Sequence, residues 1–188
     1  MEKLAFVTTN VKKFEQISAV LKDYGIELEH VNIKYPEDQE AEMADISKIA
    51  AKDLADKLQR PVIVEDTGFF LHAYNNFPGP LAKFVHKGIG LEGIMKLLEG
   101  KKRDAAFACS IGYCEPGQES ITFEGECQCQ VTKEYNMNYD HIMPYSVVCI
   151  PDGETKVFAD MTIEEKNKYS HRGMAARKLG EYLKNKNK

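Results

Sequence analysis

The stretch "VIVEDTG", residues 62–68, decides the fold, because a buried strand ends there in two adjacent carboxylates. Its three apolar residues follow Pro61 and are typical of a strand covered on both faces. Upstream, the hydrophobic pattern predicts a strand at 3–8, a helix at 11–25, a strand at 27–34 and a helix at 45–58. The resulting order of strand, helix, strand, helix and strand indicates an α/β architecture.

The second half of the sequence predicts more strands than helices. A Gly- and Pro-rich loop, "NNFPGPLAKFVHKGIG", is followed by a short helix at 90–98 and by strands at 105–113, 120–131 and 145–150. Alternation in 120–131 predicts a half-exposed antiparallel strand with Cys127 and Cys129 in the core. Thr162 and Glu165 form a capping box that opens a last helix, which Gly173 is expected to break. We expect one domain, 1–188, with an elongated mixed sheet, flanking helices and two lobes.

The composition excludes several classes of protein. The 188 residues are 43% hydrophobic and 29% charged, which is ordinary for a globular domain. A net charge of −4 argues against broad nucleic-acid binding, and no apolar run is long enough to suggest a membrane partner. The five cysteines include no C-x-x-C pair, so they signal neither zinc nor a disulfide framework. We therefore expect a cytoplasmic protein.

Two polar stretches follow predicted strands directly, where α/β sheets gather their ligands. In "TTNVKK", residues 8–13, a small polar loop opens a helix, which suits a phosphate group, with Lys13 able to reach back. An ordinary Asn N-cap with two solvated lysines is the plain alternative. In "VEDTG", Glu65 and Asp66 are oxygen ligands of the kind that Mg²⁺ prefers, although an ordinary acidic loop would look similar.

Two further stretches carry charge. Glu37 follows a predicted strand end in the acidic segment "YPEDQEAE", a weak signal when taken alone. Lys166, Ser170, His171 and Arg172 gather where the last helix is expected to break. These residues form either a preformed grip for an anion or a charged surface with ordinary ion pairs. The residues alone indicate a protein that binds a phosphorylated small molecule together with a divalent metal.

The segments "FVTTNVKKFEQI", "VIVEDTGFFLHAYNNFPGPLAKF", "FADMTIEEKN" and "SHRG", in this order and spacing, resemble the Ham1/inosine triphosphate pyrophosphatase family. The resemblance covers about residues 3–183. It implies two lobes with a cleft between them and a homodimer, with the "NNFPGP" loop as a candidate contact. It also implies Mg²⁺-dependent hydrolysis of non-standard purine nucleoside triphosphates (ITP, dITP and XTP) to the monophosphate and pyrophosphate, by attack of water on the α-phosphate.

The resemblance also implies roles for single residues. Thr8, Asn10 and Lys13 match the loop that holds the triphosphate, and Thr67 and Lys83 match further substrate contacts. Glu37 and Asp66 match the acidic pair around the metal and the attacking water, with Asp66 as the base and Glu65 as a nearby metal ligand. Lys166, Ser170, His171 and Arg172 match the segment that contacts the purine. Within it, His171 and Arg172 face the 6-oxo group.

One segment departs from the family pattern. Where relatives carry an aromatic residue that stacks on the base and an Asp beside it, a gapless alignment gives "IMPYSV", residues 142–147. Met143 then replaces the stacking ring, Tyr145 keeps an aromatic and Ser146 replaces the Asp. In the alternative alignment "MNYD", 137–140, is the motif and Asp140 is kept. The base preference can therefore be shifted or relaxed, and a non-catalytic nucleotide-binding protein is the rival from another class.

Overall fold

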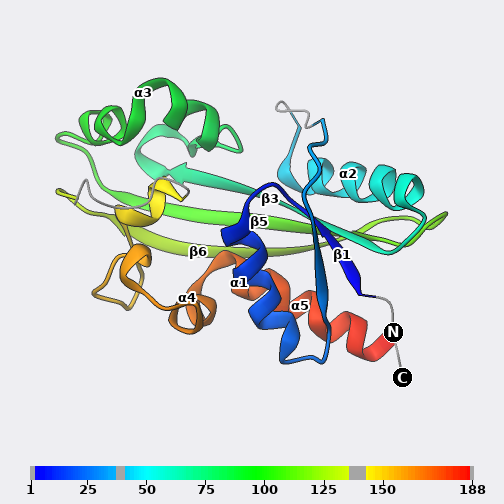
Figure 1. The fold of residues 1–188 in the computed structure, drawn as a ribbon. Coiled ribbons are helices and arrows are strands. Elements are labelled where there is room, and N and C mark those ends of the chain that lie inside the picture. Colours follow the sequence, from blue (N-terminus) through cyan, green and yellow to red (C-terminus); the bar gives the residue numbers. More distant parts are fainter. Residues whose placement is uncertain (1–2, 37–40, 136–142, 187–188) are drawn as a thin grey trace.

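One twisted, mixed sheet forms the centre of the molecule (Figure 1). The computed structural model describes residues 3–36, 41–135 and 143–186. Within these residues, the strands of the sheet are β1 (Leu4–Val7), β2 (Leu28–Val31), β3 (Val62–Leu71), β4 (Phe77–Gly79), β5 (Asp104–Cys114), β6 (Ile121–Val131) and β7 (Cys149–Pro151). The strand order is β2-β1-β3-β5-β6-β7, and β4 pairs with β3. β1 runs parallel to β2 and β3, whereas β4, β5, β6 and β7 pair antiparallel.

Helices cover both faces of this sheet, which confirms the predicted α/β architecture. The α-helices are α1 (Val11–Lys22), α2 (Met43–Leu58), α3 (Ala82–Leu97), α4 (Ile163–Tyr169) and α5 (His171–Lys186). Three short 3-10 helices are η1 (His72–Tyr74), η2 (Pro144–Val147) and η3 (Phe158–Asp160). Figure 1 shows α2 on one face and α1 with α5 on the other, while α3 lies at the far end of the long strands. None of the helices in the described part of the chain is long and apolar enough to cross a membrane.

Three hydrophobic clusters divide the molecule into two ends. At the end near the termini, one cluster lies under α1 and α5 and a second lies under α2. At the other end, a third cluster joins β3, β5, β6, α3 and η2, and includes Phe69 and Tyr145. The long strands β3, β5 and β6 pass from one end to the other, so a single sheet carries both lobes.

The sheet has a gap between these two ends. On the edge of β3 opposite β5, β1 pairs only with Val62 and Ile63. On that same edge β4 pairs only from Phe69 onward. Among the described residues, the intervening 64–68 have no strand partner on this side. The carboxylates of "VEDTG" therefore lie where the sheet is open, between the end of β1 and the start of β4.

Four expectations about local structure are wrong. The strand that begins at Val62 does not end at Glu65 and Asp66, because β3 continues to Leu71 and pairs with β5 along its whole length. Residues 82–89 form the first half of α3 rather than a loop, and the kink lies at Gly90, whose φ of 63° and ψ of −174° interrupt the helix. Residues 145–147 are 3-10 helix rather than strand, since Pro144 fixes a helical φ at the first position. The break between the last two helices is at Ser170 (ψ 148°), not at Gly173, because the extended serine caps the next helix.

Candidate active site

The loop after β1 is held in shape by its own polar groups. Asn10 is the N-cap of α1, and its Oδ1 accepts hydrogen bonds from the backbone N–H groups of Lys12 (3.0 Å) and Lys13 (3.3 Å). The hydroxyl of buried Thr8 accepts from the backbone N–H of Asn10 at 3.1 Å. The ring of His30 lies 2.8 Å from the carbonyl oxygen of Thr8. The loop is therefore preformed, with the positive end of α1 at the gap in the sheet.

Glu65 joins this loop to the far end of the chain. One carboxylate oxygen lies 2.5 Å from the Lys13 ammonium, and the other accepts from the Arg172 guanidinium at 2.8 Å. The hydroxyl of Thr67 donates to Glu65, and Arg172 donates to the same hydroxyl at 2.9 Å. The Glu65 side chain is completely buried, so this network replaces the water that a carboxylate needs.

The charge state of Glu65 follows from this network. Burial would raise the pKa of Glu65, but the charges of Arg172 and Lys13, with their hydrogen bonds, lower that pKa to about 2. The carboxylate is therefore ionised at neutral pH and holds both cations at once.

Asp66 points to the opposite face of β3 from Glu65, because side chains alternate along a strand. It pairs in register with Ser110 and is partly exposed at the gap. The predicted partner, Glu37, lies outside the described residues. No group of three or more His, Cys, Asp or Glu side chains within the described ranges could hold a metal by itself. Mg²⁺ is usually held by one or two carboxylates with substrate phosphates, and the partly exposed Asp66, whose Oδ2 is buried, is of the type that such a site uses.

The segment after α4 is buried beside this network. Ser170 caps α5 by accepting from the backbone N–H of Gly173 at 3.0 Å. The ring of His171 stacks on Phe107 with centroids 5.0 Å apart, and His171 and Arg172 are each 4% exposed. Neither ring nitrogen of His171 has a hydrogen-bond partner among the described residues. Burial, then the charge of Arg172, lowers the His171 pKa well below its usual value, so the neutral ring offers one donor and one acceptor.

Two expected cations lie at the borders of the site. Lys166 is half-buried in α4, and burial followed by the nearby charge of Lys12 lowers its pKa. Lys83 is exposed in the first turn of α3 and makes no ion pair with the described residues.

The Met143–Ser146 wall, where the chain departs from the family pattern, contacts the loop after β1. The amide nitrogen of Asn10 donates to the sulfur of Met143 at 3.8 Å, which places Met143 against the loop that precedes α1. The Ser146 hydroxyl donates to the Met143 backbone carbonyl at 2.6 Å. Tyr145 packs in the hydrophobic cluster that also contains Phe69, so its contact with a base stays a prediction. Asp140, the alternative to Ser146, lies outside the described residues.

Sequence reasoning missed two polar residues that tie the site together. Gln16 is buried on α1 and donates to the hydroxyl of Ser170 at 3.1 Å. Asn167 donates to the backbone carbonyl of Gln16 at 3.0 Å. In the sequence, the signal for Gln16 is its place next to Ile17, on the side of α1 that is buried. Through these bonds the helix that begins at Asn10 also fixes the serine before His171.

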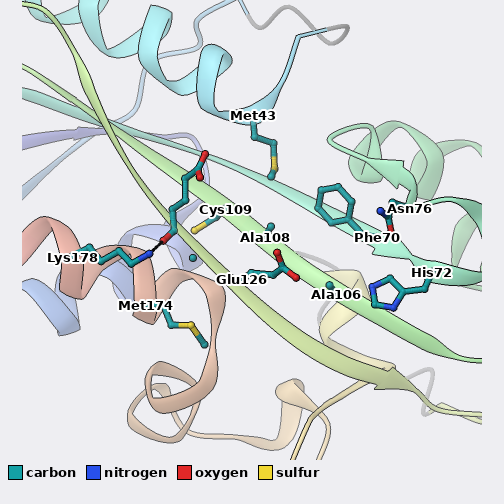
Figure 2. Close-up of a pocket in the computed structure, with 12 residues that line it drawn as sticks. Met43, Phe70, His72, Asn76, Ala106, Ala108, Cys109, Glu126, Met174 and Lys178 are labelled. Atoms are coloured by element: carbon teal, nitrogen blue, oxygen red, sulfur yellow. Dashed lines mark hydrogen bonds between the residues drawn. The ribbon is translucent and has the colours of Figure 1, made fainter.

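A separate depression of about 470 Å³ contains none of the expected site residues. Figure 2 shows Met43, Phe70 and His72 around it, with Ala106 and Ala108 of β5 among its lining. Lys178 at its border donates to the backbone carbonyl of Glu124 at 2.7 Å. The network around Glu65 is therefore distinct from this hollow.

The fold and this network are those of an α/β protein with a polar site at a gap in its sheet. The chain belongs to the Ham1 family, whose sequence pattern matches residues 4–182. It is 42% identical over 184 residues to the dITP/XTP pyrophosphatase of Methanopyrus kandleri, covering 97% of each chain. Identity to the dITP/XTP pyrophosphatase of Methanosarcina mazei is 42% over 180 residues, covering 93% of this chain and 94% of that one. The structure of the Staphylococcus aureus Ham1 protein shares the fold, with a TM-score of 0.79 at 18% identity, covering 98% of this chain and 100% of that one.

Proposed function

We propose that this chain hydrolyses dITP, XTP and ITP to the nucleoside monophosphate and pyrophosphate. The main support is the buried carboxylate of Glu65. It contacts Lys13, in the loop proposed to bind phosphates, and Arg172, in the segment proposed to face the base. A nucleoside triphosphate needs these two kinds of contact at opposite ends. Membership of the Ham1 family, with relatives that are dITP/XTP pyrophosphatases, supports the same reaction.

In the proposed reaction, Asp66 accepts a proton from water, and the water oxygen bonds to the α-phosphorus. The bond from the α-phosphorus to the bridging oxygen breaks, and pyrophosphate leaves. Thr8, Asn10 and Lys13 hold the phosphates, and Lys83 adds positive charge near the leaving group. Proton transfer by a positioned carboxylate and stabilisation of the leaving charge are the two effects required.

We propose Mg²⁺ as the cofactor, held by Asp66 and Glu37 together with the phosphates of the substrate. When bound, it would neutralise charge on the departing pyrophosphate. We assign Glu65 to positioning Lys13 and Arg172, because both of its oxygens already contact a cation or its donors.

For the base, we propose that neutral His171 and the guanidinium of Arg172 recognise the 6-oxo group, with Ser170 and Lys166 beside them. A buried donor and acceptor without partners reject an analogue that cannot satisfy them. The Met143 and Ser146 substitutions favour a second candidate, a pyrophosphatase with a shifted base preference.

The test is pyrophosphate release by the purified chain with Mg²⁺ from dITP, XTP, ITP, dATP, GTP and dUTP at equal concentrations. We expect kcat/KM for dITP and XTP at least about a hundredfold above that for dATP, the discrimination that one unpaired polar group supports. Equal values for dITP and dATP would favour the shifted preference. Release from none of them would refute hydrolysis.

We also propose a cytoplasmic homodimer. The five cysteines are free thiols, which suits a reducing compartment. In the "NNFPGP" region and the helix after it, Phe77, Phe84 and Ile89 expose 42%, 66% and 46% of their surface, as apolar residues at a protein interface do in the free subunit. Light scattering should give twice the chain mass of 21.3 kDa, and Phe84→Glu should shift it toward the single-chain value. A monomeric wild-type chain would refute the dimer.

A further inference from the structure

Tyr145 lies where three segments of the candidate site meet. Its ring is 6% exposed and stacks on Phe69 of β3, with centroids 4.4 Å apart. His86 of α3 makes a T-shaped contact with the same ring at 5.9 Å. Tyr145 itself belongs to η2, next to Ser146. One side chain thus contacts the strand that carries Asp66 and the helix that carries Lys83.

The hydroxyl of Tyr145 makes a buried hydrogen bond to the start of α3. It donates to the backbone carbonyl of Ala82 at 2.8 Å, one residue before Lys83. The N-cap residue of this helix, Leu81, offers no side-chain hydrogen bond of its own. Burial raises the pKa of the Tyr145 phenol, so the donor keeps its proton at neutral pH. The bond therefore fixes the backbone from which the Lys83 side chain extends.

We propose that Tyr145 is a positioning residue that holds Lys83 in place relative to the Met143–Ser146 wall. Through it the start of α3, which carries Lys83, and η2, which carries Ser146, keep a fixed spacing. The inference rests on the proposed function, because it takes Lys83 as a phosphate contact. Positioning of this kind matters because displacement of a contact by about 1 Å can cost as much as about a hundredfold in rate.

The same helix offers a matched control at its other end. The hydroxyl of Tyr74 donates to the backbone carbonyl of Leu97, the last residue of α3. The two halves of α3 are separated by the kink at Gly90. Tyr74→Phe and Tyr145→Phe therefore each remove a hydroxyl that donates to a backbone carbonyl of α3, but only Tyr145→Phe acts on the half that carries Lys83.

The experiment compares Tyr145→Phe, Tyr74→Phe, Lys83→Ala and the double variant Tyr145→Phe/Lys83→Ala. We expect both tyrosine variants to lower the melting temperature by similar amounts. Only Tyr145→Phe should lower kcat/KM for dITP, by about tenfold, the equivalent of one buried hydrogen bond. Lys83→Ala should then cost less in the Tyr145→Phe background than in the wild type, because the two residues act through one contact.

Wild-type kcat/KM in Tyr145→Phe, an equal loss in Tyr74→Phe, or independent effects in the double variant would overturn the proposal. Calorimetric binding of inorganic tripolyphosphate supplies a second readout that needs no turnover. Tyr145→Phe should weaken this binding and Tyr74→Phe should leave it unchanged. If the wild-type chain releases no pyrophosphate from any nucleotide, the proposed function fails while tripolyphosphate binding still decides the role of Tyr145.

Discussion

At the scale of residues, one carboxylate organises the site. The Glu65 side chain is completely buried against two cations, so its negative charge compensates theirs in the fold. Removing one partner of a buried ionic network is costly because the remaining charges lose their compensation. Asp66, its neighbour in sequence, points to the other face of β3. Alternation along a single strand thus places the buried Glu65 and the proposed base, Asp66, on opposite faces.

Glu65→Gln should change how stability depends on pH. The folded-state pKa of about 2 lies below the ordinary value of 4.5, so the unfolded chain binds the proton more tightly. The carboxylate therefore stabilises the fold fully above about pH 5, and this stabilisation is lost as pH falls toward 2. The whole shift corresponds to roughly 3 kcal/mol, of which about 2 kcal/mol is lost by pH 3, so urea unfolding should show wild type and variant converging by about 2 kcal/mol between pH 7 and 3. Curves that stay parallel would refute this role.

His171→Phe tests whether the ring nitrogens of His171 recognise the base. Phenylalanine keeps a ring that can stack on Phe107 but removes both unpartnered nitrogens. We expect the melting temperature to hold while kcat/KM for dITP falls about tenfold or more, with little change for dATP. Pyrophosphate release from the two nucleotides gives the ratio directly. An unchanged ratio would show that the imidazole does not read the base.

At the scale of elements, close contacts between backbones decide where α5 lies. A Cβ at Gly125 of β6 would lie 2.1 Å from the carbonyl oxygen of His171 and 2.8 Å from the nitrogen of Ala175. A Cβ at Gly112 of β5 would lie 2.1 Å from the carbonyl oxygen of Ser47 in α2. Glycines of the long strands therefore let helices on both faces approach the sheet. The close contact at Gly125 determines where the start of α5, which carries His171 and Arg172, lies against the sheet.

Gly125→Ala should therefore damage both the packing and the site. The added methyl group must push the first turn of α5 away, at a cost of about 1–3 kcal/mol, and move His171 with it. Chemical denaturation and kcat/KM for dITP measure the two effects. Gly88→Ala is the control, because no atom lies within 4 Å of its Cβ and alanine favours the exposed helix by up to about 1 kcal/mol. Equal stability of the two variants would contradict the close approach.

At the scale of the whole molecule, the sequence predicts the order of elements better than their boundaries. Buried runs such as "VIV" and the alternation in 120–131 predicted strands that the structure confirms, because burial on a sheet leaves a direct trace in the pattern. The helical start of α3 was missed, since Gly and Pro nearby dominate the local signal while Tyr145, distant in sequence, holds Ala82. The resemblance gave the family correctly.

The site was predictable only in part. Polar residues next to buried apolar runs marked Lys13, Glu65 and Asp66, although β3 continues to Leu71 and both carboxylates lie within it. The contact of Glu65 with Arg172 spans 107 residues of sequence, so no local pattern shows it. No local pattern reveals that Gln16 fixes Ser170. A one-dimensional sequence shows which groups are available, whereas the gap between β1 and β4 that brings them together is a property of strand pairing.

The most direct test is steady-state pyrophosphate release from dITP by the wild-type chain and by Asp66→Asn, with folding of both checked by circular dichroism. If Asp66 activates water at the gap in the sheet, the variant should keep its fold and bind dITP, while kcat falls at least about a hundredfold. A variant that remains within about threefold of the wild-type kcat would contradict catalysis by this carboxylate, because a general base contributes far more than that.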